Sequence, residues 1–187
     1  MRKLVMLVSL FIVSLNSFAQ IQVFEKIAKG AKPAIDINFF GYGKIDTSAN
    51  AKFKMTYFAL VEEKWAEGLV GVSYTPVKWC EIGLSAGIES VSSLYRVSAS
   101  IWLGNDKFSF FSCVEKGEGR DNWWYKSVAN YNVNKNISLG LMSWRYNNTG
   151  LFLKYNNVRF GVSPWVNVGR DLEFGINRIS YGLDIKL

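Results

Sequence analysis

Hydrophobic and polar residues alternate along most of the chain, with the period of two that predicts β-strands. The clearest run extends from Trp79 to Ser90, where aliphatic side chains fall on one face and Glu, Gly and Ser on the other. Comparable runs follow at 95–103, 123–133, 158–168 and 179–187, and less regular ones precede it at about 34–42, 52–62 and 67–75. The pattern predicts an all-β fold.

Short sequences rich in Asn, Gly, Asp and Pro separate these runs. These residues suit tight hairpins, because Asn, Asp and Gly tolerate positive φ and Pro fixes the turn. Only two connections are longer, at 43–51 and 115–122. Consecutive hairpins predict an antiparallel up-and-down arrangement, a barrel of about ten to twelve strands, with eight also allowed.

The first nineteen residues have the pattern of a secretory signal peptide. Arg2 and Lys3 precede an apolar run, and Ser17-Phe18-Ala19 supplies small residues at the two positions that signal peptidase inspects. The apolar run is shorter than the roughly 18 to 20 residues of a membrane-spanning helix. We therefore expect residues 1–19 to be cleaved before Gln20, and the protein to be exported.

Residues 20–33 differ from the rest of the chain. Apolar residues from Val23 to Ala28 have helical spacing, and Gly30 follows as a C-cap. This predicts either a short amphipathic helix, at a membrane interface or capping the barrel, or a frayed N-terminus. Residues 34–187 then form the barrel domain.

The composition of the polar face of the strands indicates whether the barrel is surrounded by water or by lipid. A barrel in water should carry many Lys, Glu, Thr and Gln side chains on that face, whereas here it is mostly Gly, Ser and Asn. Small polar residues suit a narrow interior and aliphatic ones suit lipid, where a basic side chain at mid-membrane would cost roughly 2–4 kcal/mol. The isolated charges are therefore predicted to line the lumen; they are Glu81, Glu89, Arg96 and Lys126.

Four tryptophans fall near strand ends or turns: Trp79, Trp123, Trp124 and Trp165. Indole rings favour the headgroup layer, and girdles of aromatic residues mark both interfaces of membrane barrels. These residues are therefore predicted to lie at the membrane interface; in a soluble barrel they would instead be core residues.

Taken together, the signal peptide, the turn Thr75-Pro76-Val77-Lys78-Trp79, the Gly/Ser-alternating strand up to Glu89 and the amphipathic final strand resemble those of small bacterial outer-membrane β-barrel proteins. The resemblance is one of pattern and covers essentially the whole chain after the signal. It implies a transmembrane barrel in the outer membrane, surrounded by outer-membrane lipid.

The chain contains no His, which excludes Ser-His-Asp and Cys-His catalysis and His-bearing metal sites. Glu81 and Glu89 are separated by roughly 26 Å along one strand, too far apart to act as a catalytic pair. We therefore expect no enzymatic activity, no cofactor and no metal. Cys80 and Cys113 suit one disulfide of an exported protein, or two thiols that never pair.

The formal net charge of +7 is spread along the chain, which does not favour nucleic-acid binding. Three functions remain open. The first is a structural or surface-interaction protein with a largely filled interior, facing lipid and surface polysaccharide. The second is a narrow pore or uptake channel for small solutes. The third is a soluble secreted barrel that binds an apolar ligand. The sequence leaves the oligomeric state undetermined.

Overall fold

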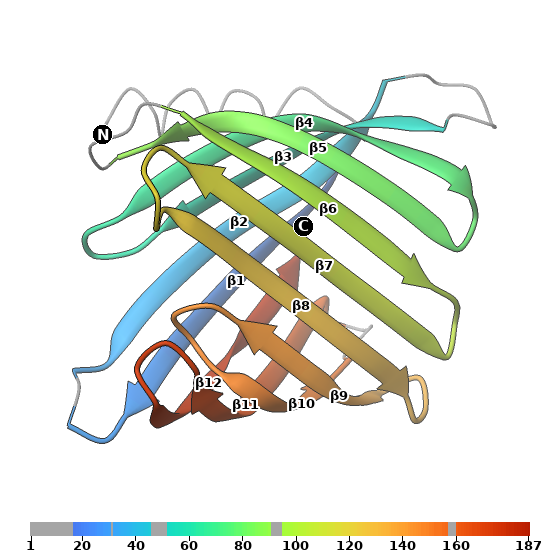
Figure 1. The fold of residues 1–187 in the computed structure, drawn as a ribbon. Coiled ribbons are helices and arrows are strands. Elements are labelled where there is room, and N and C mark those ends of the chain that lie inside the picture. Colours follow the sequence, from blue (N-terminus) through green and yellow to red (C-terminus); the bar gives the residue numbers. More distant parts are fainter. Residues whose placement is uncertain (1–16, 31, 46–51, 91–94, 157–159) are drawn as a thin grey trace.

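A computed structural model describes residues 17–187 except 31, 46–51, 91–94 and 157–159. Over these residues, twelve antiparallel strands follow one another in chain order around a closed barrel, and β12 pairs with β1 (Figure 1). The strands are β1 (Ser17–Ala28), β2 (Ala34–Lys44), β3 (Phe53–Val61), β4 (Ala66–Val77), β5 (Cys80–Glu89), β6 (Arg96–Gly104), β7 (Phe108–Gly117), β8 (Trp123–Asn132), β9 (Ile137–Trp144), β10 (Thr149–Tyr155), β11 (Val162–Asp171) and β12 (Ile176–Lys186).

The prediction of an N-terminal helix is wrong, and so is the alternative of an eight-stranded barrel. Residues 17–28 form β1, which pairs with both β2 and β12 and so closes the barrel. A strand in this place satisfies backbone groups on two neighbouring edges, which a helix would leave unpaired. Phe24 points inward and is buried, while its neighbour Val23 lies on the outer face. In the described part of the chain, no helix is long and apolar enough to cross a membrane.

The predicted signal peptide falls largely outside the described residues. Its last three residues, 17–19, begin β1 and pair with residues 41–43 of β2. Cleavage before Gln20 stays a prediction, and it would shorten β1 by these three residues.

The outer surface of the barrel is apolar because the strand period of two directs aliphatic side chains outward. In β5, Ile82, Leu84 and Ile88 are exposed, while Glu89 is buried in the interior. Leu141 and Leu151 continue this apolar surface on β9 and β10. Exposed apolar area on this scale is not tolerated in water, and it matches the lipid-facing band of a membrane barrel.

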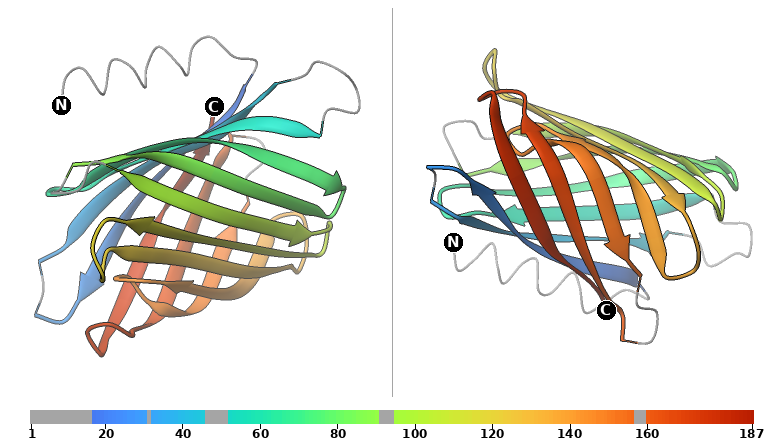
Figure 2. Two further views of the ribbon diagram at one scale, coloured as in Figure 1. Left: turned by 45° about the horizontal axis from the view of Figure 1, so that its top comes forward. Right: turned by 90° about the horizontal axis from the view of Figure 1, so that it is seen from below.

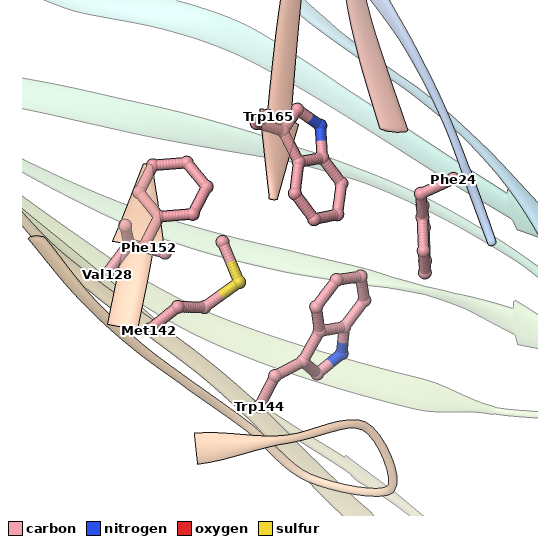
Figure 3. Packing of buried hydrophobic residues seen from close by; sticks show 6 residues of the cluster. All are labelled: Phe24, Val128, Met142, Trp144, Phe152 and Trp165. Atoms are coloured by element: carbon pink, nitrogen blue, oxygen red, sulfur yellow. The ribbon is translucent and has the colours of Figure 1, made fainter. Parts of the chain in front are cut away.

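The two walls of the interior differ in bulk. Six buried side chains from β1 and β8–β11 pack together and project across the lumen (Figure 3); we call this cluster the aromatic waist, formed by Phe24, Val128, Met142, Trp144, Phe152 and Trp165. The strands β4 to β6, on the opposite wall (Figures 1 and 2), carry small inward-facing residues instead, among them Gly71, Ser73, Gly83, Ser85, Ser98 and Ser100. The free lumen therefore lies beside the small wall.

The two cysteines are free thiols, so the disulfide weighed from the sequence does not form. Cys80 begins β5 and Cys113 lies in β7, and β6 separates these strands. We predict that unfolded protein never exposed to a reductant takes up two maleimide–polyethylene glycol adducts, as counted on a denaturing gel. Labelling that requires prior reduction would contradict this.

Candidate functional site

The barrel has two ends with different chemistry. At one end, which we call the terminal end, β1 begins and β12 finishes. At the other, which we call the mouth end, lie the turns that join β1 to β2, β3 to β4, β5 to β6, β7 to β8, β9 to β10 and β11 to β12 (Figure 1). The groups that bear charge inside the barrel divide between these ends.

A buried ion cluster lies on the small wall at the mouth end. The Arg96 guanidinium, 3 % exposed, lies 2.9 Å from the Glu67 carboxylate, 2.8 Å from Glu89 and 2.7 Å from Glu115. These four residues come from the neighbouring strands β4 to β7, and Asn122 accepts a further hydrogen bond from Arg96 at 3.0 Å. One cation thus neutralises part of the charge of three carboxylates, an arrangement that charge-assisted hydrogen bonds hold rigidly.

Two glycines make room for this cluster. Arg96 is paired across the sheet with Gly87 on β5 and Gly117 on β7. A Cβ atom at Gly117 would come within 2.4 Å of the Asn122 amide and 3.1 Å of the Glu89 carboxylate. A side chain at Gly117 would therefore displace groups that bind Arg96, whereas a Cβ atom at Gly87 would meet the Gly68 carbonyl oxygen of β4 at 1.8 Å.

Further ion pairs surround the mouth on the other strands. Lys26 of β1 lies 2.6 Å from Asp36 and 3.3 Å from Glu62. Across the opening, Arg145 lies 3.0 Å from Glu173. A cavity of about 340 Å³ opens between these groups, and Lys26, Glu62, Glu67, Arg96, Asp121 and Arg145 line it together with aromatic rings.

The aromatic rings that line the mouth cavity are continuous with the aromatic waist, because Trp144 belongs to both. Trp65, Trp123, Trp124 and Trp144 all line the cavity. The Trp144 ring then contacts Phe24, with ring centroids 4.7 Å apart, and Phe24 lies 5.8 Å from Trp165 (Figure 3). The waist therefore forms an apolar layer between the mouth and the rest of the lumen.

A second polar group, which we call the inner network, consists of Gln22, Asn38, Lys126, Lys154 and Asp184. It lies toward the terminal end of the waist, and Lys126 reaches it from its position opposite Trp144. Gln22 donates to Asp184 at 2.7 Å and accepts from Lys126 at 3.1 Å. Lys154 is ion-paired with Asp184, which also accepts a hydrogen bond from the Trp165 indole. Closer to the terminal end, Lys54 lies 2.6 Å from Glu81.

The structure places all four sequence-predicted lumen residues on inward-facing positions. Glu89 and Arg96 meet in one cluster, Glu81 pairs with Lys54, and Lys126 belongs to the inner network. Their role in passage of a solute stays a prediction.

Sequence reasoning missed two of the Arg96 partners. Glu115 was read as part of the long connection 115–122, but it lies within β7, two residues from the inward-facing Cys113. Glu67 falls at the uncertain start of its strand, where alternation has too few residues to establish a face. Extending the period of two back from the middle of each strand would have placed both inside.

Two of the predicted interface tryptophans require correction. Trp79, 59 % exposed in the β4–β5 turn, lies on the outside, and Trp123, 38 % exposed, lies at the mouth end of β8, where it also lines the cavity. Trp124 follows Trp123 directly in a strand, so it must point inward, and it packs edge-on against Trp144. Trp165 is only 4 % exposed and belongs to the waist, because its indole finds a hydrogen-bond acceptor inside, at Asp184.

The small wall is not covered by the waist. Ser85, Ser98 and Ser100 of this wall, and Thr56 of the adjoining β3, face inward near the middle of the barrel and keep part of their surface exposed. Solvent therefore reaches the lumen beside the waist, which does not agree with a largely filled interior.

Among the described residues, no group of three or more His, Cys, Asp or Glu side chains is arranged to hold a metal ion. Arg96 occupies the space between the three glutamates that would otherwise be nearest to such a group.

Neither a protein-family model nor a curated protein matches the chain. Solved structures do match its fold. A KdgM porin is 16 % identical, with a TM-score of 0.60, over 90 % of this chain and 99 % of that one, and another structure of it is a complex with disordered oligogalacturonate. A NanC porin is 10 % identical, with a TM-score of 0.52, over 89 % and 97 %. Outer membrane phospholipase A from Escherichia coli is 10 % identical, with a TM-score of 0.55, over 90 % and 92 %. The fold is therefore that of bacterial outer-membrane β-barrel proteins.

Proposed function

We propose that this chain is a narrow channel of the bacterial outer membrane that passes small polar solutes. The observation that carries the proposal is the lumen itself: a closed barrel, apolar outside, has a wall of small, partly exposed polar residues inside. The predicted signal peptide supports export. The fold shared with the KdgM and NanC porins supports a channel, and the KdgM complex with oligogalacturonate supports a polyhydroxylated solute.

The similarity in fold to the phospholipase is no evidence that this chain is an enzyme. Fold alone does not transmit an activity, which depends on the residues of a site. This chain has no His to serve as a general base, and its interior carboxylates are held by cationic side chains. We therefore propose transport without enzymatic activity.

Planar-bilayer recording on the refolded protein tests the proposal. Discrete current steps are expected, because the path beside the small wall is polar and reaches solvent. A preparation that shows heat-modifiable migration, and is thus folded, yet gives neither current steps nor uptake of an uncharged sugar into proteoliposomes would refute the channel.

A second measurement locates the path. Ser98→Trp adds an indole to the small wall facing the waist, and we expect it to reduce the single-channel conductance strongly. Ala99→Trp is the matched control, since Ala99 is the next residue of β6 and faces outward; its conductance should equal that of the unmodified protein. Equal conductance for both variants would show that ions do not pass along this wall.

A further inference from the structure

The mouth carries an excess of negative charge. Among the described residues, three cationic side chains either line the mouth cavity or pair with groups that do: Lys26, Arg96 and Arg145. Seven carboxylates meet the same criterion: Asp36, Glu62, Glu67, Glu89, Glu115, Asp121 and Glu173. The described turns and strand ends outside the cavity are mainly basic, with Lys29, Lys32, Lys64, Lys116, Arg120 and Arg170 against Glu63 and Glu118. These side chains are exposed, so water and salt screen their charges. An anion that approaches the cavity therefore meets net repulsion.

The terminal half of the lumen has the opposite excess. Among the described inward-facing residues there, Lys54 and Lys154 balance Glu81 and Asp184, and Lys44 and Lys186 add positive charge at the ends of β2 and β12. The Lys126 ammonium also reaches this region, from beside Trp144 to Gln22. The described turns of this end carry Lys52, Lys78, Lys107 and Lys135 against Asp106, and these exposed charges are screened like those of the mouth turns. A cation that passes the waist therefore meets net repulsion.

The apolar waist keeps the two charged regions apart. Phe24 lies on β1 between Gln22 of the inner network and Lys26 of the mouth. Solutes cross the two regions in series, and charges act strongly in a narrow lumen with low-dielectric walls. A solute of either sign thus meets one unfavourable region, whereas an uncharged solute meets none.

The mouth cavity also offers contacts for an uncharged polyhydroxylated solute. Trp65, Trp124 and Trp144 line it, and aromatic rings pack against the apolar C–H surface of a sugar ring. Asn147, 1 % exposed, also lines the cavity, and its side-chain Nδ2 has no hydrogen-bond partner among the described residues. The amide is buried, so a solute in the cavity would contact Asn147 only after this side chain shifts.

From this charge division and this lining we infer that the channel selects uncharged polyhydroxylated solutes over both anionic and cationic ones of the same size. The inference rests on the proposed channel function and specifies its solute. The solute inferred for this chain differs from the oligogalacturonate seen with the KdgM porin, because galacturonate carries an acidic group.

Three sugars of one size provide the test: galactose, galacturonate and galactosamine. Initial uptake of each, labelled and at trace concentration, is measured in proteoliposomes with the same dilute salt on both sides. Galactose is expected to enter fastest, and the difference should shrink as salt is raised, since screening shortens the reach of charge. Uptake of galacturonate or galactosamine equal to or faster than that of galactose would overturn the inference alone. Uptake of none, with bare liposomes as reference, would overturn the proposed function and the inference with it.

A variant with fewer carboxylates tests whether the mouth cavity is what discriminates against galacturonate. The double variant Glu62→Gln, Asp121→Asn removes two cavity carboxylates whose side chains are not buried, so galacturonate uptake should rise toward that of galactose. Glu63→Gln is the control, because Glu63 neighbours Glu62 but does not line the cavity; it should leave the ratio unchanged. An unchanged ratio in the double variant would contradict a role of the mouth charge.

Discussion

Arg96→Met is expected to leave most of the protein unable to form the heat-modifiable barrel. The guanidinium is 3 % exposed and is the shared partner of Glu67, Glu89 and Glu115. Without it, three carboxylates stay buried beside one another, and removing one partner of a buried ion pair typically costs about 3–5 kcal/mol. Such a loss is a large part of the stability of an ordinary domain. The folded fraction and the urea midpoint measure the effect.

Two further variants separate charge from volume. Arg120→Met removes the same functional group from an exposed turn and should leave the urea midpoint unchanged. In the Arg96→Met background, adding Glu67→Gln and Glu115→Gln should restore part of the folded fraction, because uncharged amides relieve the repulsion. If Arg96→Met folds with the midpoint of the unmodified protein, the cluster does not stabilise the barrel.

Trp144→Ala is expected to raise the single-channel conductance while it lowers stability. Trp144 is buried between Phe24 and Trp124, and the Lys126 ammonium lies 3.8 Å from its ring centroid. Its removal opens the waist toward the mouth cavity, so that the two polar regions of the lumen become joined. Truncation of a buried Trp costs about 3–5 kcal/mol, and the urea midpoint should fall accordingly.

Trp79→Ala is the matched control for the conductance. Trp79 is exposed in the β4–β5 turn, away from the waist, so its removal should change neither the conductance nor, beyond a few tenths of a kcal/mol, the stability. Conductance that is unchanged in Trp144→Ala, in protein shown to be folded, would mean that the waist does not limit the path.

Alternation in β5 shows how far a sequence alone can specify a membrane barrel. Its period of two placed Glu81 and Glu89 on one face and the aliphatic residues on the other, and the small size of the polar residues identified that face as the interior. The same rule failed for residues 20–28, because Val23, Phe24, Ile27 and Ala28 fit a helix as well as a strand. Only the need to close the sheet between β2 and β12 decides for the strand.

Adjacent residues show the same limit for the side chains. Trp123 and Trp124 were both assigned to the interface from residue type, yet consecutive residues of a strand face opposite sides. Trp165 was placed outside on its nearness to a turn, but its acceptor Asp184 lies on the neighbouring strand, paired in a register that no local pattern reveals.

The sequence by itself determined the all-β class, the lipid-facing side of the strands and the inward direction of Glu81, Glu89, Arg96 and Lys126, because each of these depends on the period of two and on side-chain chemistry. The tertiary structure alone decided the number of strands, the convergence of Glu67, Glu89 and Glu115 on Arg96, and the waist that separates a negative mouth from a positive inner half. These depend on register and closure, which bring residues from different strands to one level of the barrel. A local pattern can specify which way a side chain points, but it cannot specify which other side chains it meets.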